Sequence, residues 1–151
     1  MAGKPTKKSA APFFKLERRL VQSPGYRSLS ATARLVLVEL MAQSNGKNNG
    51  DLSATRTMAK EWGIGSPVTL QKALTELENA GWIVQTRSSL FSRHGARCAL
   101  YALAWLPVHE CPGKELELGP TAAPVRPLPT LLGSNSSGSE NEQGPVQKVN
   151  T

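Results

Sequence analysis

A group of short polar, amide and basic side chains between positions 66 and 75 has the residue types that contact with nucleic acid requires. The amide of Gln71 can pair with the edge of adenine, and the ammonium of Lys72 with guanine or with a phosphate. A helix that begins at Ser66 can also hold a phosphate on the free N–H groups of its first turn. The candidates for contact with duplex DNA in this segment are Ser66, Val68, Thr69, Gln71, Lys72 and Thr75.

These side chains share a surface only if residues 66–80 form one helix, and the sequence predicts such a helix. Ser66 followed by Pro67 is a start signal, because the hydroxyl caps a free N–H and proline has none to satisfy. Gly81 marks the end. An apolar stripe at helical spacing is expected to face the core: Leu70, Ala73, Leu74 and Leu77. The polar candidates then point outward.

The residues before this helix predict a second helix that meets it at a corner. Ser53 or Thr55 can cap a helix ending near Trp62, and Gly63 is suited to the left-handed conformation that ends helices. Ala59 is small enough for two helix backbones to cross closely. Two helices joined at a glycine corner indicate a helix-turn-helix.

The residues after Gly81 predict a β-hairpin, with strands at 82–87 and 96–105 joined by a loop at 88–95. Alternation in the second strand favours burial of its larger face, Ala99, Tyr101, Leu103 and Trp105. The loop would be a wing that approaches the minor groove or the DNA backbone. Its candidate contacts are Arg87, Arg93, His94 and Arg97.

Two more helices are expected on the N-terminal side. Phe13, Leu16, Leu20 and Val21 suit one face of a helix over 13–22, which Ser23-Pro24-Gly25 should end. Ser30 can cap a helix over 31–43 whose apolar residues are too numerous for one stripe, so we expect it to be covered on more than one side. The Asn-Gly pairs that follow predict sharp turns, with Leu52 in a short strand.

Composition divides the chain into three parts: a flexible basic arm at 1–12, a folded domain at 13–112, and a disordered tail rich in Pro, Gly and Ser at 113–151. Residues 1–112 hold 15 Lys and Arg against 7 Asp and Glu, a balance of +8. A basic folded part favours a polyanionic partner, nucleic acid first. The arm is either an electrostatic grip on DNA or an ordinary frayed terminus. Residues 128–132 are either tail or a short linear motif.

Other functional classes find little support in the residues. The two cysteines form no zinc or disulfide pattern, and His109-Glu110-Cys111 falls short of a metal site. No catalytic or nucleotide-binding motif occurs, so we expect neither an enzyme nor a cofactor. No apolar run approaches the roughly 20 residues that span a bilayer, and no export signal is apparent. We expect a cytoplasmic protein, associated with the nucleoid or a plasmid.

Several segments together resemble a known group: SPGYRSLSATARLVLVEL, NGKNNGDLSAT, LQKALTELENAGWIVQTR and ALYALAW. They are similar to small bacterial helix-turn-helix proteins of plasmids, prophages and other mobile elements, related in fold to winged-helix replication initiators and regulators. The resemblance covers about residues 14–106. It implies a mainly α fold with a small β-hairpin, a winged helix-turn-helix. The turn at 63–69 is one residue longer than usual in that fold.

The resemblance and the charge together predict a sequence-specific protein that binds double-stranded DNA. The favoured role is a transcriptional regulator of a bacterial chromosome, plasmid or phage, which would bind paired sites as a homodimer. One alternative is a replication initiator or accessory protein, which would bind repeated sites and meet other replication proteins. A second alternative is a winged helix used only for protein–protein interaction.

Overall fold

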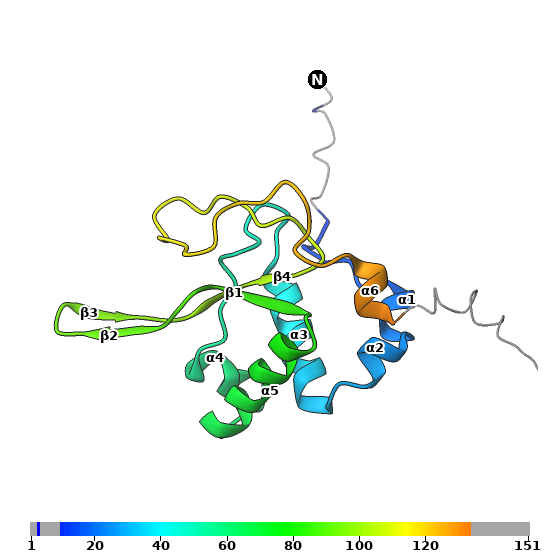
Figure 1. Cartoon of the computed structure of the whole chain (residues 1–151), viewed down its shortest axis with the longest axis horizontal. Helices are drawn as coiled ribbons and strands as arrows, with labels where there is room; N and C mark the ends of the chain where they lie inside the picture. Colours follow the sequence, from blue (N-terminus) through cyan, green and yellow to red (C-terminus); the bar gives the residue numbers. More distant parts are fainter. Residues whose placement is uncertain (1–2, 4–9, 134–151) are drawn as a thin grey trace, which may run out of the picture.

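The computed structural model describes residue 3 and residues 10–133. Most of the predicted basic arm and the last part of the predicted tail, residues 134–151, lie outside this range. Within it, the helices are α1 (Arg18–Val21), α2 (Pro24–Arg27), α3 (Ala31–Gln43), α4 (Arg56–Glu61), α5 (Pro67–Asn79) and α6 (Leu128–Leu132). The strands are β1 (Ile83–Arg87), β2 (Leu90–Ser92), β3 (Gly95–Arg97) and β4 (Leu100–Leu103), and the described part is a small α+β fold (Figure 1).

The N-terminal segment differs from its prediction. Within the predicted range of 13–22 only α1 is helical, and Phe13 is 86% exposed. A further short helix, α2, follows because the Ser23 hydroxyl accepts a hydrogen bond from Tyr26 N and Pro24 occupies the first turn. The same serine–proline pair that was expected to end one helix begins another.

Helix α3 has the predicted bounds and the predicted cap, with the Ser30 hydroxyl accepting from Ala33 N. It buries one wide face made of Ala33, Val36, Leu37, Leu40 and Met41. The expectation that α3 is covered on more than one side is wrong, because Ala31, Leu35 and Ala42 remain exposed on the opposite side.

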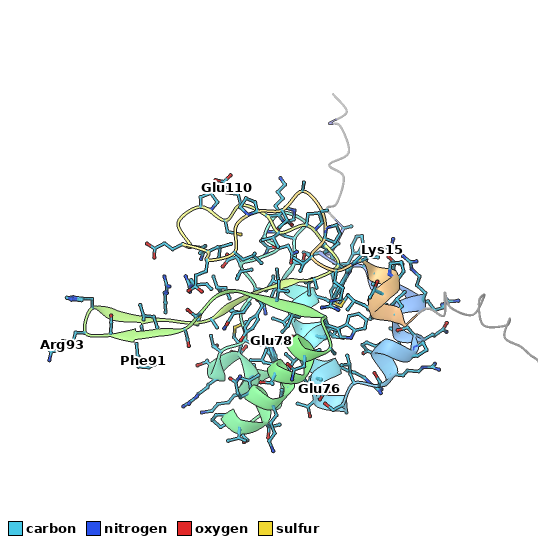
Figure 2. The ribbon with its side chains drawn as sticks, in the orientation of Figure 1. Lys15, Glu76, Glu78, Phe91, Arg93 and Glu110 are labelled. Atoms are coloured by element: carbon cyan, nitrogen blue, oxygen red, sulfur yellow. The ribbon has the colours of Figure 1, made fainter. Side chains whose placement is uncertain are left out.

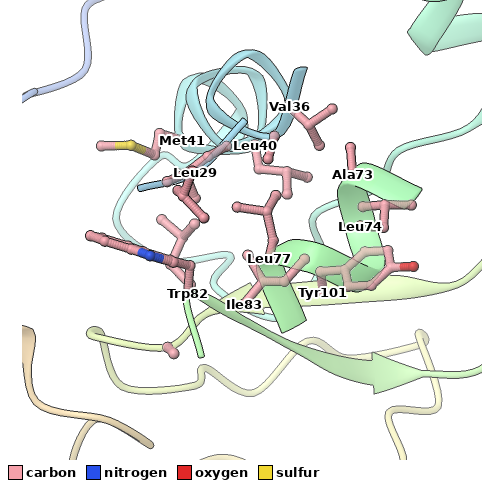
Figure 3. Packing of buried hydrophobic residues seen from close by; sticks show 14 of the residues in the cluster. Leu29, Val36, Leu40, Met41, Ala73, Leu74, Leu77, Trp82, Ile83 and Tyr101 are labelled. Atoms are coloured by element: carbon pink, nitrogen blue, oxygen red, sulfur yellow. The ribbon is translucent and has the colours of Figure 1, made fainter. Parts of the chain in front are cut away.

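Helices α4 and α5 meet at the predicted corner. Thr55 caps α4, Gly63 has a φ of +92°, and the N–H of Ile64 donates to Ala59 O over 2.8 Å. Ala59 is 1% exposed, as expected for a close crossing. The stripe of α5 from Leu70 to Leu77 is buried as predicted. Figure 3 shows its side chains between those of α3 and those of the first strand.

The β-structure consists of two antiparallel pairs. Strand β1 pairs with β4, with Ile83 opposite Leu103 and an irregularity between Gln85 and Arg87. Strand β2 pairs with β3, with Phe91 opposite Ala96. The segment expected to be a loop is therefore largely a second hairpin, which projects away from the helices (Figure 1). Leu52 forms the short bridge expected of it, with Tyr101.

The chain after residue 112 packs on the domain, so the predicted domain boundary is wrong. Residues 113–127, called the strap below, cross the side of the β1–β4 sheet opposite the helices (Figure 1). The N–H groups of Glu117 and Leu118 donate to Thr86 O, and that of Arg126 donates to Ala104 O. Because helices and strap cover the two sides, both faces of β4 are buried rather than only the larger one.

Helix α6 then docks on α2, with Leu131 and Leu132 almost fully buried. Gly25 makes this possible, since a Cβ there would overlap the carbonyl oxygen of Leu131. Leu131 and Leu132 thus belong to the core, and residues 128–132 pack on the domain rather than forming a free linear motif. Among residues 3 and 10–133, no helix is both long and apolar enough to cross a bilayer.

Candidate nucleic-acid interface

The predicted contact residues of α5 all lie on its outward face. The exposed polar residues among them are Ser66, Thr69, Gln71, Lys72 and Thr75. The sixth predicted contact, Val68, is 62% exposed. The Ser66 hydroxyl accepts from Thr69 N over 3.3 Å, so it caps the helix itself. The Gln71 amide reaches the Thr75 hydroxyl at 3.4 Å. This face therefore offers an amide, an ammonium, two threonine hydroxyls and a small apolar contact to a partner.

Helix α5 is held in one orientation by a contact from its C-terminal half. Both carboxylate oxygens of Glu76 accept hydrogen bonds from Ser30, one from the backbone N–H and one from the hydroxyl, each 2.7 Å long. The buried stripe fixes the helix from the other side. Through these two bonds Glu76 helps to position the outward face, and Figure 2 shows it on the side of α5 beside the N-terminal end of α3.

The β2–β3 hairpin carries Arg93 and His94 at its turn, as predicted for the loop. Both are exposed, and Arg93 lies at the far tip of the molecule (Figure 2). The turn is closed by Ser92, whose hydroxyl donates to Gly95 O and accepts from His94 N. Because Ser92 fixes the backbone here, the arginine and histidine side chains extend from a defined turn.

Arg87 and Arg97 differ from the other predicted contacts because the protein itself engages them. The Arg87 guanidinium donates to Cys98 O, at 2.8 and 3.1 Å, and to Lys114 O at 3.0 Å. Arg97 forms ion pairs with Glu115 at 3.1 Å and Glu117 at 3.4 Å, and its side chain is 29% exposed. Both side chains tie the base of the hairpin to the strap, while their contact with DNA stays a prediction.

Glu117 completes this attachment. Its carboxylate accepts from the Ser88 hydroxyl at 2.6 Å and from Ser88 N at 3.1 Å. The hydrogen bonds from Ser88, followed by the nearby charges of Arg97 and Arg87, hold the pKa of the Glu117 carboxyl below its usual range. The hairpin is therefore braced by a carboxylate that sequence analysis had assigned to a disordered tail.

A groove of about 580 Å³ separates α5 from the hairpin. Its walls come from α4, α5, the hairpin and β4, and its lining includes Thr55, Arg56, Val68, Gln71, Ser89, Phe91 and Tyr101. Burial raises the pKa of Tyr101 to about 12. The exposed Arg56 is the cation that borders the groove from the side of α4.

The predicted contacts included neither Arg56 nor Phe91, although Phe91 at the wing tip is an aromatic residue that could stack on bases. The signal for Arg56 was present, because it directly follows the Thr55 cap and so stands in the first turn of the helix preceding α5. By contrast, Lys15 of the N-terminal segment does not extend this surface. Lys15 lies at the opposite end of the molecule from Arg93 (Figure 2).

The part of the chain that the structure describes contains no group of three or more His, Cys, Asp or Glu side chains arranged to hold a metal ion. The candidate surface instead consists of cations, amides, hydroxyls and exposed apolar groups on α4, α5 and the hairpin. Comparison of the chain with protein-family models, with curated proteins and with solved structures finds no match in any of the three.

Proposed function

We propose that this protein is a winged helix-turn-helix protein that binds double-stranded DNA. In this proposal α4 and α5 are the helix-turn-helix, α5 is the recognition helix, and the β2–β3 hairpin is the wing. The observation that carries the proposal is that the outward face of α5 and the projecting hairpin border one groove, with Arg56 on its rim.

Helix α5 would enter the major groove, which at about 12 Å is wide enough to admit a helix. Gln71 and Lys72 are the side chains suited to reading base edges, and Val68 is suited to contact with a thymine methyl group. Thr69 and Thr75 would make hydroxyl contacts to bases or phosphates. The N-terminal end of α5, at Ser66, would approach a phosphate through its free N–H groups.

The hairpin would lie along the adjacent minor groove, with one DNA backbone passing through the groove between α5 and the hairpin. Arg56 and Ser89 line that groove and can contact the phosphates, while Arg93 and His94 approach the backbone or the minor groove from the hairpin tip. Arg87 and Arg97 would contribute by holding the hairpin in place.

For the biological role, we propose a sequence-specific transcriptional regulator, with a replication initiator or accessory protein as the alternative. A regulator that binds as a homodimer should select two half-sites about 10 base pairs apart or a multiple of that, whereas an initiator should select repeated sites. Selection of bound sequences from random duplex DNA, using the full chain, distinguishes the two roles.

The direct test of DNA binding is a salt titration with the selected duplex. If roughly five phosphates are neutralised, log K should fall with log salt at a slope of about −4 to −5. Lys72→Ala and Gln71→Ala should reduce discrimination between sites, whereas Arg93→Ala and Arg56→Ala should weaken binding to all sequences alike. Lys15→Ala is the matched control, because it removes one exposed charge at the opposite end.

Two results would contradict the proposal. The absence of salt-dependent binding to any duplex would exclude DNA binding of this kind and favour a protein-interaction module. Equal losses of affinity from Lys15→Ala and Arg93→Ala would show that binding depends on net charge and not on this surface.

A further inference from the structure

Phe91 is the most exposed of the large hydrophobic side chains in the part of the chain that the structure describes. It stands on β2 and is 92% exposed, while Leu90 beside it is 50% exposed. The residue opposite Phe91 across the hairpin is Ala96, which is too small to cover an aromatic ring. The ring therefore adds little to folding, and its position on a narrow two-stranded ribbon leaves it accessible from the side.

The direction of this ring follows from strand alternation. Leu90 pairs with Arg97, whose side chain reaches Glu115 and Glu117 of the strap, so that face of the hairpin is turned toward the strap. Successive side chains of a strand point to opposite faces, so Phe91 points the other way. It lines the groove with Val68 and Gln71 of α5, and Figure 2 shows it on the side of the hairpin where α4 and α5 lie.

The surroundings of the ring combine cationic and polar side chains with apolar ones. Arg93 and His94 follow it at the turn, and Ser89 and Arg56 lie along the same groove. An anionic partner with flat apolar surfaces meets both requirements, because its phosphates suit the cations and its bases suit the ring. Duplex DNA has this combination, with phosphates on the rim of the minor groove and base faces that become accessible where two adjacent base pairs are unstacked.

We propose that Phe91 enters the minor groove and inserts its ring between two adjacent base pairs, partly unstacking them, while Arg93 contacts a neighbouring phosphate. This inference rests on the proposed function and adds a structural consequence to it. Insertion of an apolar side chain kinks duplex DNA, and pyrimidine–purine steps are the easiest to unstack. The hairpin would thus select deformable steps without hydrogen-bonding to their bases.

The test uses the full chain and the duplex obtained by selection. A series of such duplexes is made, each with 2-aminopurine at a different base step in the stretch that the hairpin would cover. Binding of the wild-type protein should raise the fluorescence of 2-aminopurine at one step, and energy transfer between the duplex ends should report a bend. Phe91→Ala should abolish both signals and weaken binding by on the order of ten-fold. Phe91→Tyr should largely restore both signals, because it keeps the ring.

Leu90→Ala is the matched control, since it removes an exposed apolar side chain from the opposite face of the same strand. It should leave the fluorescence and the bend as in the wild type. Because Phe91 is 92% exposed, Phe91→Ala should also unfold at the wild-type urea concentration, which excludes loss of the fold as the cause.

The outcomes separate this inference from the proposed function. If the wild type binds duplex but Phe91→Ala binds, bends and unstacks it equally well, the insertion is wrong and DNA binding stands. The insertion is also wrong, and DNA binding stands, if Phe91→Ala keeps its effects on duplex DNA but loses self-association or loses binding to anionic vesicles. If the wild type binds no duplex, the proposed function and the insertion are both wrong.

Discussion

Glu76 of α5 and Ser30 at the start of α3 are joined by two hydrogen bonds, each 2.7 Å long, one to the backbone N–H and one to the hydroxyl of the serine. This carboxylate satisfies an N–H that α3 leaves free and at the same time orients α5. Since the outward face of α5 is the candidate interface, the contact couples the stability of the fold to the geometry of the site.

Glu76→Ala should therefore lower the free energy of unfolding by about 1.5–3 kcal/mol, the usual contribution of hydrogen bonds to a charged group. Urea denaturation measures this loss. Glu78→Ala, two residues further along the same helix, should change stability by no more than about 0.5 kcal/mol. Equal effects of the two substitutions would mean that the contact with Ser30 contributes nothing specific.

A second prediction concerns Asn49, whose side chain is fully buried. Its amide nitrogen lies 2.9–3.2 Å from the carbonyl oxygens of Leu103, Leu106 and Pro107, and its oxygen accepts from Leu103 N at 2.7 Å. Asn49→Asp would replace a donor by a carboxylate oxygen facing three carbonyl oxygens. The pKa of this Asp should be raised in the folded state by burial and by those oxygens.

The sign of the pH dependence follows. The folded-state pKa of this Asp would lie above the unfolded value of about 3.9. The stability of the Asn49→Asp protein relative to wild type should therefore be greatest below about pH 4 and should fall as the pH rises above that value. Urea denaturation at a series of pH values measures the difference. Asn45→Asp is the control, because Asn45 is exposed and its side-chain oxygen acts only as an acceptor, from Lys47 N. A pH-independent difference for Asn49→Asp would contradict the prediction.

A third prediction concerns the docking of α6 on Gly25. Gly25→Ala should push the carbonyl of Leu131 away and destabilise the fold by about 1–3 kcal/mol, as overpacking usually does. Faster amide hydrogen exchange in residues 128–132 would localise the effect. Gly119→Ala is the matched control, because a Cβ there meets no atom within 4 Å. Unchanged exchange in α6 would show that it tolerates the methyl group.

A fourth prediction follows from the lowered pKa of Glu117. A lowered folded-state pKa means that the attachment of the hairpin to the strap is complete above the ordinary carboxyl pKa near 4.3 and is lost as pH falls below it. The amide resonance of Ser88 should shift with this titration, because that N–H donates to the carboxylate. Glu117→Gln should remove the titration, while Glu110→Gln should leave it unchanged. A Ser88 shift that persists in Glu117→Gln would point to a different titrating group.

The local elements were largely predictable because their signals lie within a few residues of one another. Ser30 and Ser66 cap their helices, Gly63 and Gly81 take the positive φ expected of helix ends, and the stripe from Leu70 to Leu77 is buried. The outward face of α5, and with it most of the candidate site, follows from that stripe. Helix α2 was not predicted, because the serine–proline pair at its start was interpreted only as a stop.

The path of the strap and the fate of two arginines depend on contacts between residues far apart in the chain. Nothing in the composition of residues 113–133 indicates that Glu117 reaches Ser88 and Arg97, or that Leu131 packs on Gly25, because these segments lack hydrophobic periodicity. Arg87 and Arg97 resembled Arg93 in sequence, yet folding surrounds them with carbonyl and carboxylate oxygens and leaves Arg93 at an exposed tip. The amino-acid sequence alone thus determines the helices and turns, because their signals are local. Only the folded structure decides which arginines are structural and which are exposed, since an ion pair requires proximity in space.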